Sequence, residues 1–513
     1  MRKRFLTLMV LTLVAIVTMG VTAVNAKTLT IALQDELSDL DPGFGSTIAV
    51  NEKVINLIFD GLVEYGEGLE LIPGVAKSWE ISEDGTIYTF YLREGITFHN
   101  GQPLRAEDVK FTFERILDPD AGSGQRAKVQ LIDRIEVIDQ YTVRFYLQEP
   151  YSPFLLAMTF GIVPKDYVTE VGRDYFARNP IGSGPFKLTE WRSGDRVVLA
   201  ANPDYYLGKP NLDTVVIRPI SEPTVQAIEL KSGGIDVATH LGVPQLEELS
   251  ADSRFEVVSA PGTSLDFIGF MNTLPPYDNV DLRRVLYMAT PFTQAVPSMY
   301  NNIGVRGYSW ISPMLWPDDS EYMKAHALEY NPGEAKRLYE QLKAEGVVAD
   351  DFVVDVWVAS SSGPQLRLAE IMVTSLQQIG IRARTQVIEF GTLMDKMAAE
   401  ETGVYFFGFG SDADPDFWLY RWFHSEGSLN FSKYADPDVD RWLDEARAVT
   451  DQEQRGELYK QVLRRALTED YIHIPYAFLN DTLVYNKRVT GLRAGFPGHI
   501  LLMSPIANVD VVE

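Results

Sequence analysis

The residues best suited to chemistry in this 513-residue chain are three aspartates in one short segment, Asp412, Asp414 and Asp416. Their i, i+2, i+4 spacing is that of the first ligands of a calcium-binding loop. Such a loop needs glycine at its sixth position and a bidentate glutamate at its twelfth. Here those positions hold Phe417 and Phe423, so the sequence argues against calcium. Two interpretations stay open, a solvated turn and a set of carboxylates that face a ligand.

The sequence lacks the usual catalytic patterns. Its six histidines are far apart without a zinc-binding spacing, and no serine stands in the GxSxG pattern of a hydrolase. The chain has no cysteine, which excludes disulfides, thiolate metal sites and a cysteine nucleophile. We therefore predict a protein that is not an enzyme and that needs no metal or cofactor. Paired carboxylates among 71 acidic residues leave a secreted hydrolase as an alternative of another class.

The composition limits the class of protein. Hydrophobic residues make up 46% of the chain and charged residues 23%, which is enough apolar material for a large core. At about 150 residues per domain, the length predicts two or three domains. A net charge of −25 repels phosphate groups over most of the surface, so a general nucleic-acid binder is disfavoured.

The first residues predict export. Residues 2–4 are basic, residues 5–17 are apolar, and the side chains of Val24 and Ala26 suit a signal peptidase. The apolar stretch is shorter than the ~20 residues that a membrane-spanning helix needs. We expect cleavage after Ala26 and a periplasmic protein that is not a lipoprotein, because no cysteine is present to carry the lipid.

A mixed pattern of strands and helices must position these residues. Short runs rich in β-branched and aromatic residues predict strands at residues 28–33, 87–92, 142–147 and 186–191. From about residue 265 strands alternate with longer helices, over residues 352–358, 365–378, 382–387, 392–400 and 405–409. This alternation predicts βαβ units, which bind ligands beyond the carboxyl ends of their strands. The aspartate segment follows the last strand and therefore belongs to such an end.

One long segment resembles a known family. Residues 79–115, WEISEDGTIYTFYLREGITFHNGQPLRAEDVKFTFER, closely resemble the signature of family 5 of the extracytoplasmic solute-binding proteins, which serve peptide and nickel ABC importers. Further matching segments are residues 41–42, 59–62, 182–188, 202–206, 331–336, 369–383 and 431–446. They follow the family's order over nearly the whole chain after the signal peptide. The chain is thus identified as a member of this family, similar to its dipeptide- and oligopeptide-binding proteins.

The resemblance implies a fold. Proteins of this family have the two-lobed α/β fold of periplasmic binding proteins, in the class II, cluster C form, with an extra domain inserted in one lobe. The implied boundaries are residues 27–60, 180–267 and 485–513 for lobe I, residues 61–179 for the inserted domain and residues 268–484 for lobe II. Residues 267–271 and 474–478 should form the hinge. Such proteins close their lobes over a ligand and then dock on a membrane permease, and we expect a monomer.

The resemblance also bears on the ligand. Dipeptide-binding members carry an aspartate at the start of a D-x-x-[DE]-P segment, which binds the α-amino group, and an arginine that binds the α-carboxylate. In this chain Ser411 and Ala359 stand at those two positions. The loss of two charge-assisted hydrogen bonds, each worth ~1.5–3 kcal/mol, predicts that dipeptides bind weakly. Asp412, one residue further along, is a candidate for the amine contact.

Oligopeptides are the leading ligand and oligosaccharides the alternative. A peptide backbone can pair with the glycine-rich strand end at residues 408–411, and this pairing needs no terminal charge. A sugar would stack on aromatic side chains of lobe II. The candidate ligand-binding residues are Phe44, Gly45, Tyr308, Trp310, Trp357, Gly408, Phe409, Gly410, Ser411, Asp412 and Trp418. The expected protein partners are the permease subunits of an ABC importer.

Overall fold

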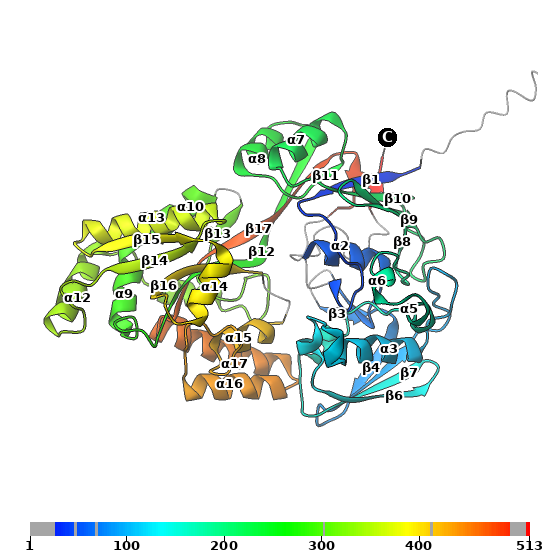
Figure 1. The fold of residues 1–513 in the computed structure, drawn as a ribbon, viewed down its shortest axis with the longest axis horizontal. Helices are drawn as coiled ribbons and strands as arrows, with labels where there is room; N and C mark the ends of the chain where they lie inside the picture. Colours follow the sequence, from blue (N-terminus) through cyan, green and yellow to red (C-terminus); the bar gives the residue numbers. More distant parts are fainter. Residues whose placement is uncertain are drawn as a thin grey trace, which may run out of the picture.

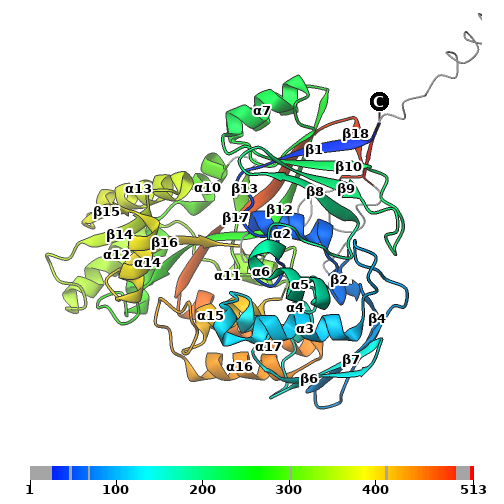
Figure 2. The same ribbon diagram turned by 45° about the vertical axis from the view of Figure 1, so that its right-hand side comes forward.

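The computed structural model describes residues 26–45, 49–66, 70–300, 303–410, 414–492 and 509–512. The expected signal peptide up to residue 25 and two candidate site residues, Ser411 and Asp412, lie outside these ranges. Figures 1 and 2 show two lobes joined by a pair of long strands, with a further domain below the right-hand lobe. The structure therefore has the two-lobed α/β fold that the resemblance implies.

Two strands cross between the lobes, β12 (Phe255–Phe270) and β17 (His473–Asn486). They pair antiparallel over most of their length, with a register shift near the middle. β17 also pairs with β11 (Val237–Ala238) on the lobe I side, and β12 pairs with β16 (Val404–Phe409) on the lobe II side. One sheet therefore runs through both lobes, in the order β15-β14-β16-β12-β17-β11-β1-β10-β9-β8, with β13 beside β17.

Lobe I contains the end of this sheet that runs from β11 to β8. β1 lies parallel to both β10 and β11, while β8, β9 and β10 are antiparallel neighbours. Its elements are β1 (Thr28–Leu33), α2 (Ala49–Ile58), β8 (Phe186–Arg192), β9 (Arg196–Ala201), β10 (Thr214–Pro219), α7 (Pro223–Ser232), α8 (Val243–Ser250), β18 (Val489–Thr490) and β19 (Asp510–Val511). Apolar side chains of β1, α2 and β10 form its core, among them Ile31, Val54 and Val215.

The inserted domain is an antiparallel sheet, in the order β4-β5-β7-β6, with a helix on one face. Phe113 of the helix packs edge-on against Phe145 of the sheet, with ring centroids 5.1 Å apart. The elements are β2 (Val63–Tyr65), β3 (Leu71–Pro73), β4 (Ala76–Ile81), β5 (Ile87–Leu92), α3 (Ala106–Leu117), β6 (Ile132–Asp139), β7 (Thr142–Leu147) and α4 (Phe154–Ala157). The next two helices, α5 (Lys165–Val171) and α6 (Arg173–Phe176), pack through Val168 and Phe176 into the core of lobe I. The family signature at residues 79–115 thus runs from β4 through α3.

Lobe II contains the predicted alternation of strands and helices. Its elements are α9 (Val280–Ala289), α10 (Phe292–Tyr300), β13 (Gly304–Arg306), α11 (Ser320–His326), α12 (Pro332–Ala344), β14 (Val354–Ala359), α13 (Gly363–Gln378), β15 (Ala383–Ile388), α14 (Phe390–Ala398), α15 (Asp416–Phe423), α16 (Pro437–Ala448) and α17 (Gln452–Arg464). The prediction is confirmed apart from shifts at element ends. For example, α13 begins at Gly363 because Pro364 suits the first turn of a helix, where no N–H donor is needed.

None of the helices among the described residues is both long and apolar enough to cross a membrane. Nowhere in the same ranges do three or more histidine, aspartate or glutamate side chains gather as a metal ion would require.

Candidate functional site

The end of strand β16 has an open edge. β14 pairs with β16 at only two positions, Val356 with Val404 and Trp357 with Tyr405. The last four residues of β16, residues 406–409, therefore have a strand partner only on the β12 side, within the part of the chain that the structure describes. Strands that diverge at their carboxyl ends form the usual ligand site of open α/β sheets.

A buried carboxylate lies against this end of β16. Asp266 of β12 is 6% exposed and accepts hydrogen bonds from Tyr300 Oη at 2.5 Å and from Gln365 Nε2 at 2.9 Å. Burial raises the pKa of Asp266 to about 6, and the two hydrogen bonds oppose this rise. A Cβ atom at position 408 would lie only 2.1 Å from Asp266 Oδ1, so Gly408 is required there. Asp266 is not among the site residues predicted from the sequence, although a lone aspartate in an apolar strand is itself a signal.

The predicted aromatic residues of lobe II pack against one apolar cluster. Tyr308, Trp357, Phe409 and Trp418 are all partly buried against it. Phe409 stacks on Trp418 with ring centroids 4.6 Å apart. Trp310 differs from the others because it is 2% exposed and stacks on His473 in the interior. Trp310 is therefore a core residue with little surface for a sugar ring, whereas the other four keep some exposed surface.

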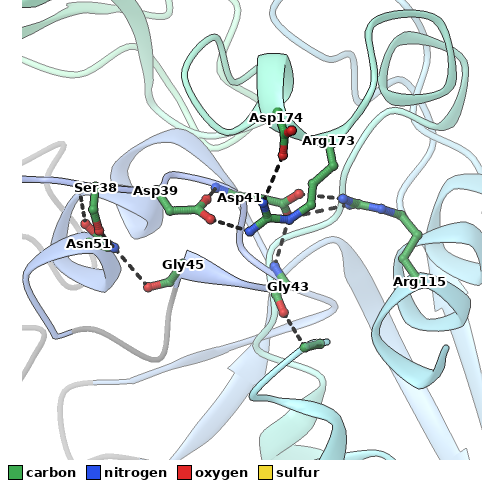
Figure 3. A network of polar contacts seen from close by, with 10 residues as sticks. Ser38, Asp39, Asp41, Gly43, Gly45, Asn51, Arg115, Arg173 and Asp174 are labelled. Carbon is green, nitrogen blue, oxygen red and sulfur yellow. Dashed lines mark hydrogen bonds and ion pairs between the residues drawn. The ribbon is translucent and has the colours of Figure 1, made fainter. Parts of the chain in front are cut away.

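Phe44 and Gly45 lie on lobe I, in the loop after β1. Figure 3 shows Asp41 of this loop facing Arg115 of α3, with Arg173 of α6 alongside. Asp41 is fully buried, and its Oδ2 accepts from Arg115 Nη2 at 2.5 Å. The guanidinium carbons of Arg115 and Arg173 lie 5.3 and 4.6 Å from the centroid of the Phe44 ring. Both cations are therefore close enough to the Phe44 ring for a cation–π interaction.

Gly45 is held just as closely. Its carbonyl oxygen accepts a hydrogen bond from Asn51 Nδ2 at 3.2 Å, as Figure 3 shows. A Cβ atom at this position would lie 2.2 Å from the carbonyl oxygen of Asp39, so only glycine fits. The structure thus gives Phe44 and Gly45 clear structural contacts, and their predicted contact with a ligand stays a prediction.

Two of the three aspartates with the spacing of a calcium-binding loop form internal ion pairs. Asp414 Oδ1 accepts from Arg455 Nη2 at 2.8 Å, and Asp416 Oδ1 accepts from Arg447 Nε at 3.0 Å. Both carboxylates are buried. They connect the start of α15 to α16 and α17, and Asp414 and Arg455 also line a cavity beside the inserted domain, so a ligand-facing role for Asp414 stays a prediction.

Two α/β lobes joined by crossing strands, with a strand edge left open beside the junction, define a ligand-binding protein of the periplasmic class. The family model of the bacterial extracellular solute-binding proteins, family 5 (middle), matches residues 70–430. The chain belongs to this family.

Named relatives agree with this assignment. Di/tripeptide-binding protein 1 of Pseudomonas aeruginosa is 30% identical over 456 residues, which cover 82% of this chain and 83% of the relative. HbpA2 from Haemophilus parasuis matches the structure with a TM-score of 0.85 at 25% identity, over 95% of this chain and 100% of that one. DppA from Helicobacter pylori, solved with the peptide STSA, matches with a TM-score of 0.77 at 26% identity, over 96% and 100% of the two chains.

Proposed function

We propose that this protein is the extracytoplasmic solute-binding component of an ABC importer, which captures oligopeptides between its lobes and delivers them to the membrane permease. Family membership supports solute binding and assigns the chain no catalytic role. The names of two relatives support peptides as the solute, namely the di/tripeptide-binding protein of P. aeruginosa and the H. pylori protein that carries STSA. Export through a signal peptide cleaved after Ala26, the division into domains given above and a monomeric state are parts of the same proposal.

The open edge of β16 is the observation that carries this proposal. Residues 406–409 are paired only with β12 among the described residues, and the exposed Gly410 follows them. An extended peptide can bind to such an edge through main-chain hydrogen bonds, with its side chains directed alternately to either side. This mode requires neither of the charges that are missing at Ala359 and Ser411.

The experiment begins with protein that has been unfolded and refolded to remove any bound compound. It is incubated with a tryptic digest of casein mixed with cello- and malto-oligosaccharides, and the retained compounds are identified by mass spectrometry. We expect peptides of several residues to be retained, and dipeptides to be retained weakly or not at all. Retention of sugars without peptides would overturn the proposal in favour of the oligosaccharide alternative.

A further inference from the structure

A cavity of about 550 Å³ lies between the inserted domain and lobe II. One wall comes from β3, β4, β5 and α4, and the other comes from the loop before α11 and from the start of α17. None of residues 404–409 of β16 lines this cavity, so it is separate from the open strand edge. Its volume falls in the range of roughly 300–1,000 Å³ in which proteins hold small-molecule ligands.

Both walls of the cavity carry aromatic and aliphatic side chains. Trp79 of β4 packs against the core of the inserted domain, and Trp316 packs against a core of lobe II. Leu156 of α4 and Met314 of lobe II add aliphatic surface. Aromatic rings make favourable stacked or edge-on contacts with one another, so these walls suit a ligand that contains an aromatic ring.

A buried cation borders one end of the cavity. The side chain of Arg455 is 6% exposed, and it lines the cavity. Its Nε atom donates to the carbonyl oxygen of Ala446 at 3.1 Å, and its Nη2 atom donates to Asp414 Oδ1 at 2.8 Å and to Tyr459 Oη at 3.0 Å. Its Nη1 atom donates to none of the residues that the structure describes. Most donors of buried side chains are paired, so Nη1 suits a hydrogen-bond acceptor of a ligand.

The charges at this end favour a neutral acceptor. Asp414 already neutralises Arg455, and Glu70 is the other charged residue of the lining among the described residues. A carboxylate on the ligand would gain little from the neutralised pair and would be repelled by Glu70. An amide or carbonyl oxygen can accept from Nη1 without bringing a charge into the cavity.

The two walls of the cavity also contact each other directly. Ser152 of the inserted domain lines the cavity and donates from its N–H to the carbonyl oxygen of Arg447 at 2.9 Å. Its hydroxyl group donates to the carbonyl oxygen of Val449, after α16. The walls belong to parts that separate when the lobes open, so the complete cavity requires the closed arrangement.

We propose that this cavity is a second ligand site, for a neutral aromatic compound with an amide or carbonyl oxygen, and that its occupation stabilises the closed protein. A ligand that binds one of two arrangements shifts the equilibrium toward that arrangement. Under the proposed function, on which this coupling rests, peptide also favours closure. The two ligands should then strengthen each other's binding by the same factor. Binding of the aromatic compound alone does not depend on the proposed function.

The test uses indole-3-acetamide as the probe, which has an aromatic bicycle and a neutral amide and is not a peptide. Calorimetry on the refolded protein should give a dissociation constant of about 1 mM or tighter. Saturation with a peptide recovered from the casein digest should tighten it about fivefold or more. 3-Methylindole, which lacks the amide, should bind about fivefold more weakly than the probe, because Nη1 then has no acceptor.

Two variants locate the probe. Ile81 is exposed at the edge of the cavity, so Ile81→Trp should fill part of the space and weaken probe binding about tenfold. Ile138→Trp is the matched control, because Ile138 is exposed on β6 of the same sheet and does not line the cavity. It should bind the probe like the wild type. Arg455→Lys keeps the charge beside Asp414 but has no Nη1, so it should abolish the preference for indole-3-acetamide over 3-methylindole.

Each outcome has a defined meaning, and circular dichroism checks the fold of every variant. The inference is overturned if the probe does not bind, or if Ile81→Trp and Ile138→Trp bind it equally. Displacement of the probe by peptide would place it in the peptide site and would also overturn the inference. If both ligands bind and neither changes the affinity of the other, the coupling is wrong. If the probe binds as expected but no peptide is retained, the proposed function fails while the second site stands.

Discussion

At the scale of residues, several carboxylates lie in the interior of this protein. Asp41, Asp60 and Asp266 are 0%, 4% and 6% exposed, and each accepts at least two hydrogen bonds. Asp481 is partly buried, and its Oδ2 atom accepts no hydrogen bond from any residue that the structure describes. Removal of one partner from a buried pair leaves an uncompensated charge, so these residues should respond strongly to substitution.

The Asp41–Arg115 pair provides the first prediction. Arg115→Met leaves Asp41 buried without its cation and should lower the free energy of unfolding by about 3–5 kcal/mol. Adding Asp41→Asn removes the stranded charge and should restore much of the loss. Arg192→Met, which breaks a surface pair with Glu190, should cost about 1 kcal/mol or less. Urea unfolding measures all three, and equal losses for Arg115→Met and Arg192→Met would contradict the argument.

A second prediction concerns pH and the neighbouring acids Asp60 and Glu64. Burial raises the pKa of Asp60 to about 6, and burial followed by the charge of Asp60 raises that of Glu64 well above its usual range. Both protons are bound more tightly in the folded state, so their contribution to stability is present at pH 4 and is lost as the pH rises through 6 and beyond.

Glu64→Gln should therefore be more stable relative to the wild type at pH 8 than at pH 5, by about 1–3 kcal/mol. The substitution keeps the acceptor that Gly61 N donates to at 2.8 Å. Thermal melting at the two pH values measures the difference. Glu83 is exposed, so Glu83→Gln serves as the control. The stability of this variant should differ from that of the wild type by the same amount at pH 5 and at pH 8.

At the scale of elements, β16 pairs with β12 along one side, and beyond Tyr405 no described strand pairs with its other side. Gly410→Pro removes a main-chain donor at this strand end and should weaken peptide binding about tenfold. Gly410→Ala keeps the donor, and its Cβ would meet only Ser264 Oγ at an ordinary 3.5 Å, so it should bind peptides like the wild type. Calorimetry with a peptide recovered from the casein digest compares the two, and equal affinities would argue against backbone pairing.

At the scale of the whole molecule, the lobes also touch away from the crossing strands. Ser152 N of the inserted domain donates to the carbonyl oxygen of Arg447 in α16 at 2.9 Å, and Lys128 Nζ lies 5.0 Å from the centroid of the Phe417 ring. Figure 1 shows α16 and α17 beside the inserted domain. These contacts connect parts that must separate when the lobes open.

We therefore expect ligand to compact the molecule by rotation of the lobes. The chain has no cysteine, so Asp174→Cys and Asp438→Cys would provide two unique labelling sites, one on α6 and one on α16. Saturating peptide should increase energy transfer between the dyes and lower the radius of gyration in small-angle scattering. At a peptide concentration equal to the wild-type Kd, the same pair of labels in Gly410→Pro should respond about fivefold less, because a tenfold weaker site is then only about 9% occupied. If peptide changes neither the energy transfer nor the radius of gyration of the labelled protein that keeps Gly410, closure of the lobes is contradicted.

The sequence by itself determined the elements and the family. Strands such as β5 and helices such as α13 are set by side chains a few residues apart, so their patterns are visible without the fold. The contiguous signature at residues 79–115 identified the family for the same reason, and the family model confirms it. The glycine-rich strand end at residues 408–411 was expected from the sequence to offer main-chain groups to a peptide, and that contact stays a prediction.

Only the tertiary structure decided which side chains share a site. The sequence places Trp310 in a loop, where a tryptophan could face a ligand, but the fold buries its ring against His473. The sequence does not show which cations pair with Asp414 and Asp416. In the fold, arginines of α16 and α17 form ion pairs with them. Lys53 and Asp481 stand at opposite ends of the chain and meet only because β17 returns from lobe II to lobe I. Burial and pairing depend on contacts between distant segments, and a local pattern carries no information about which segments those are.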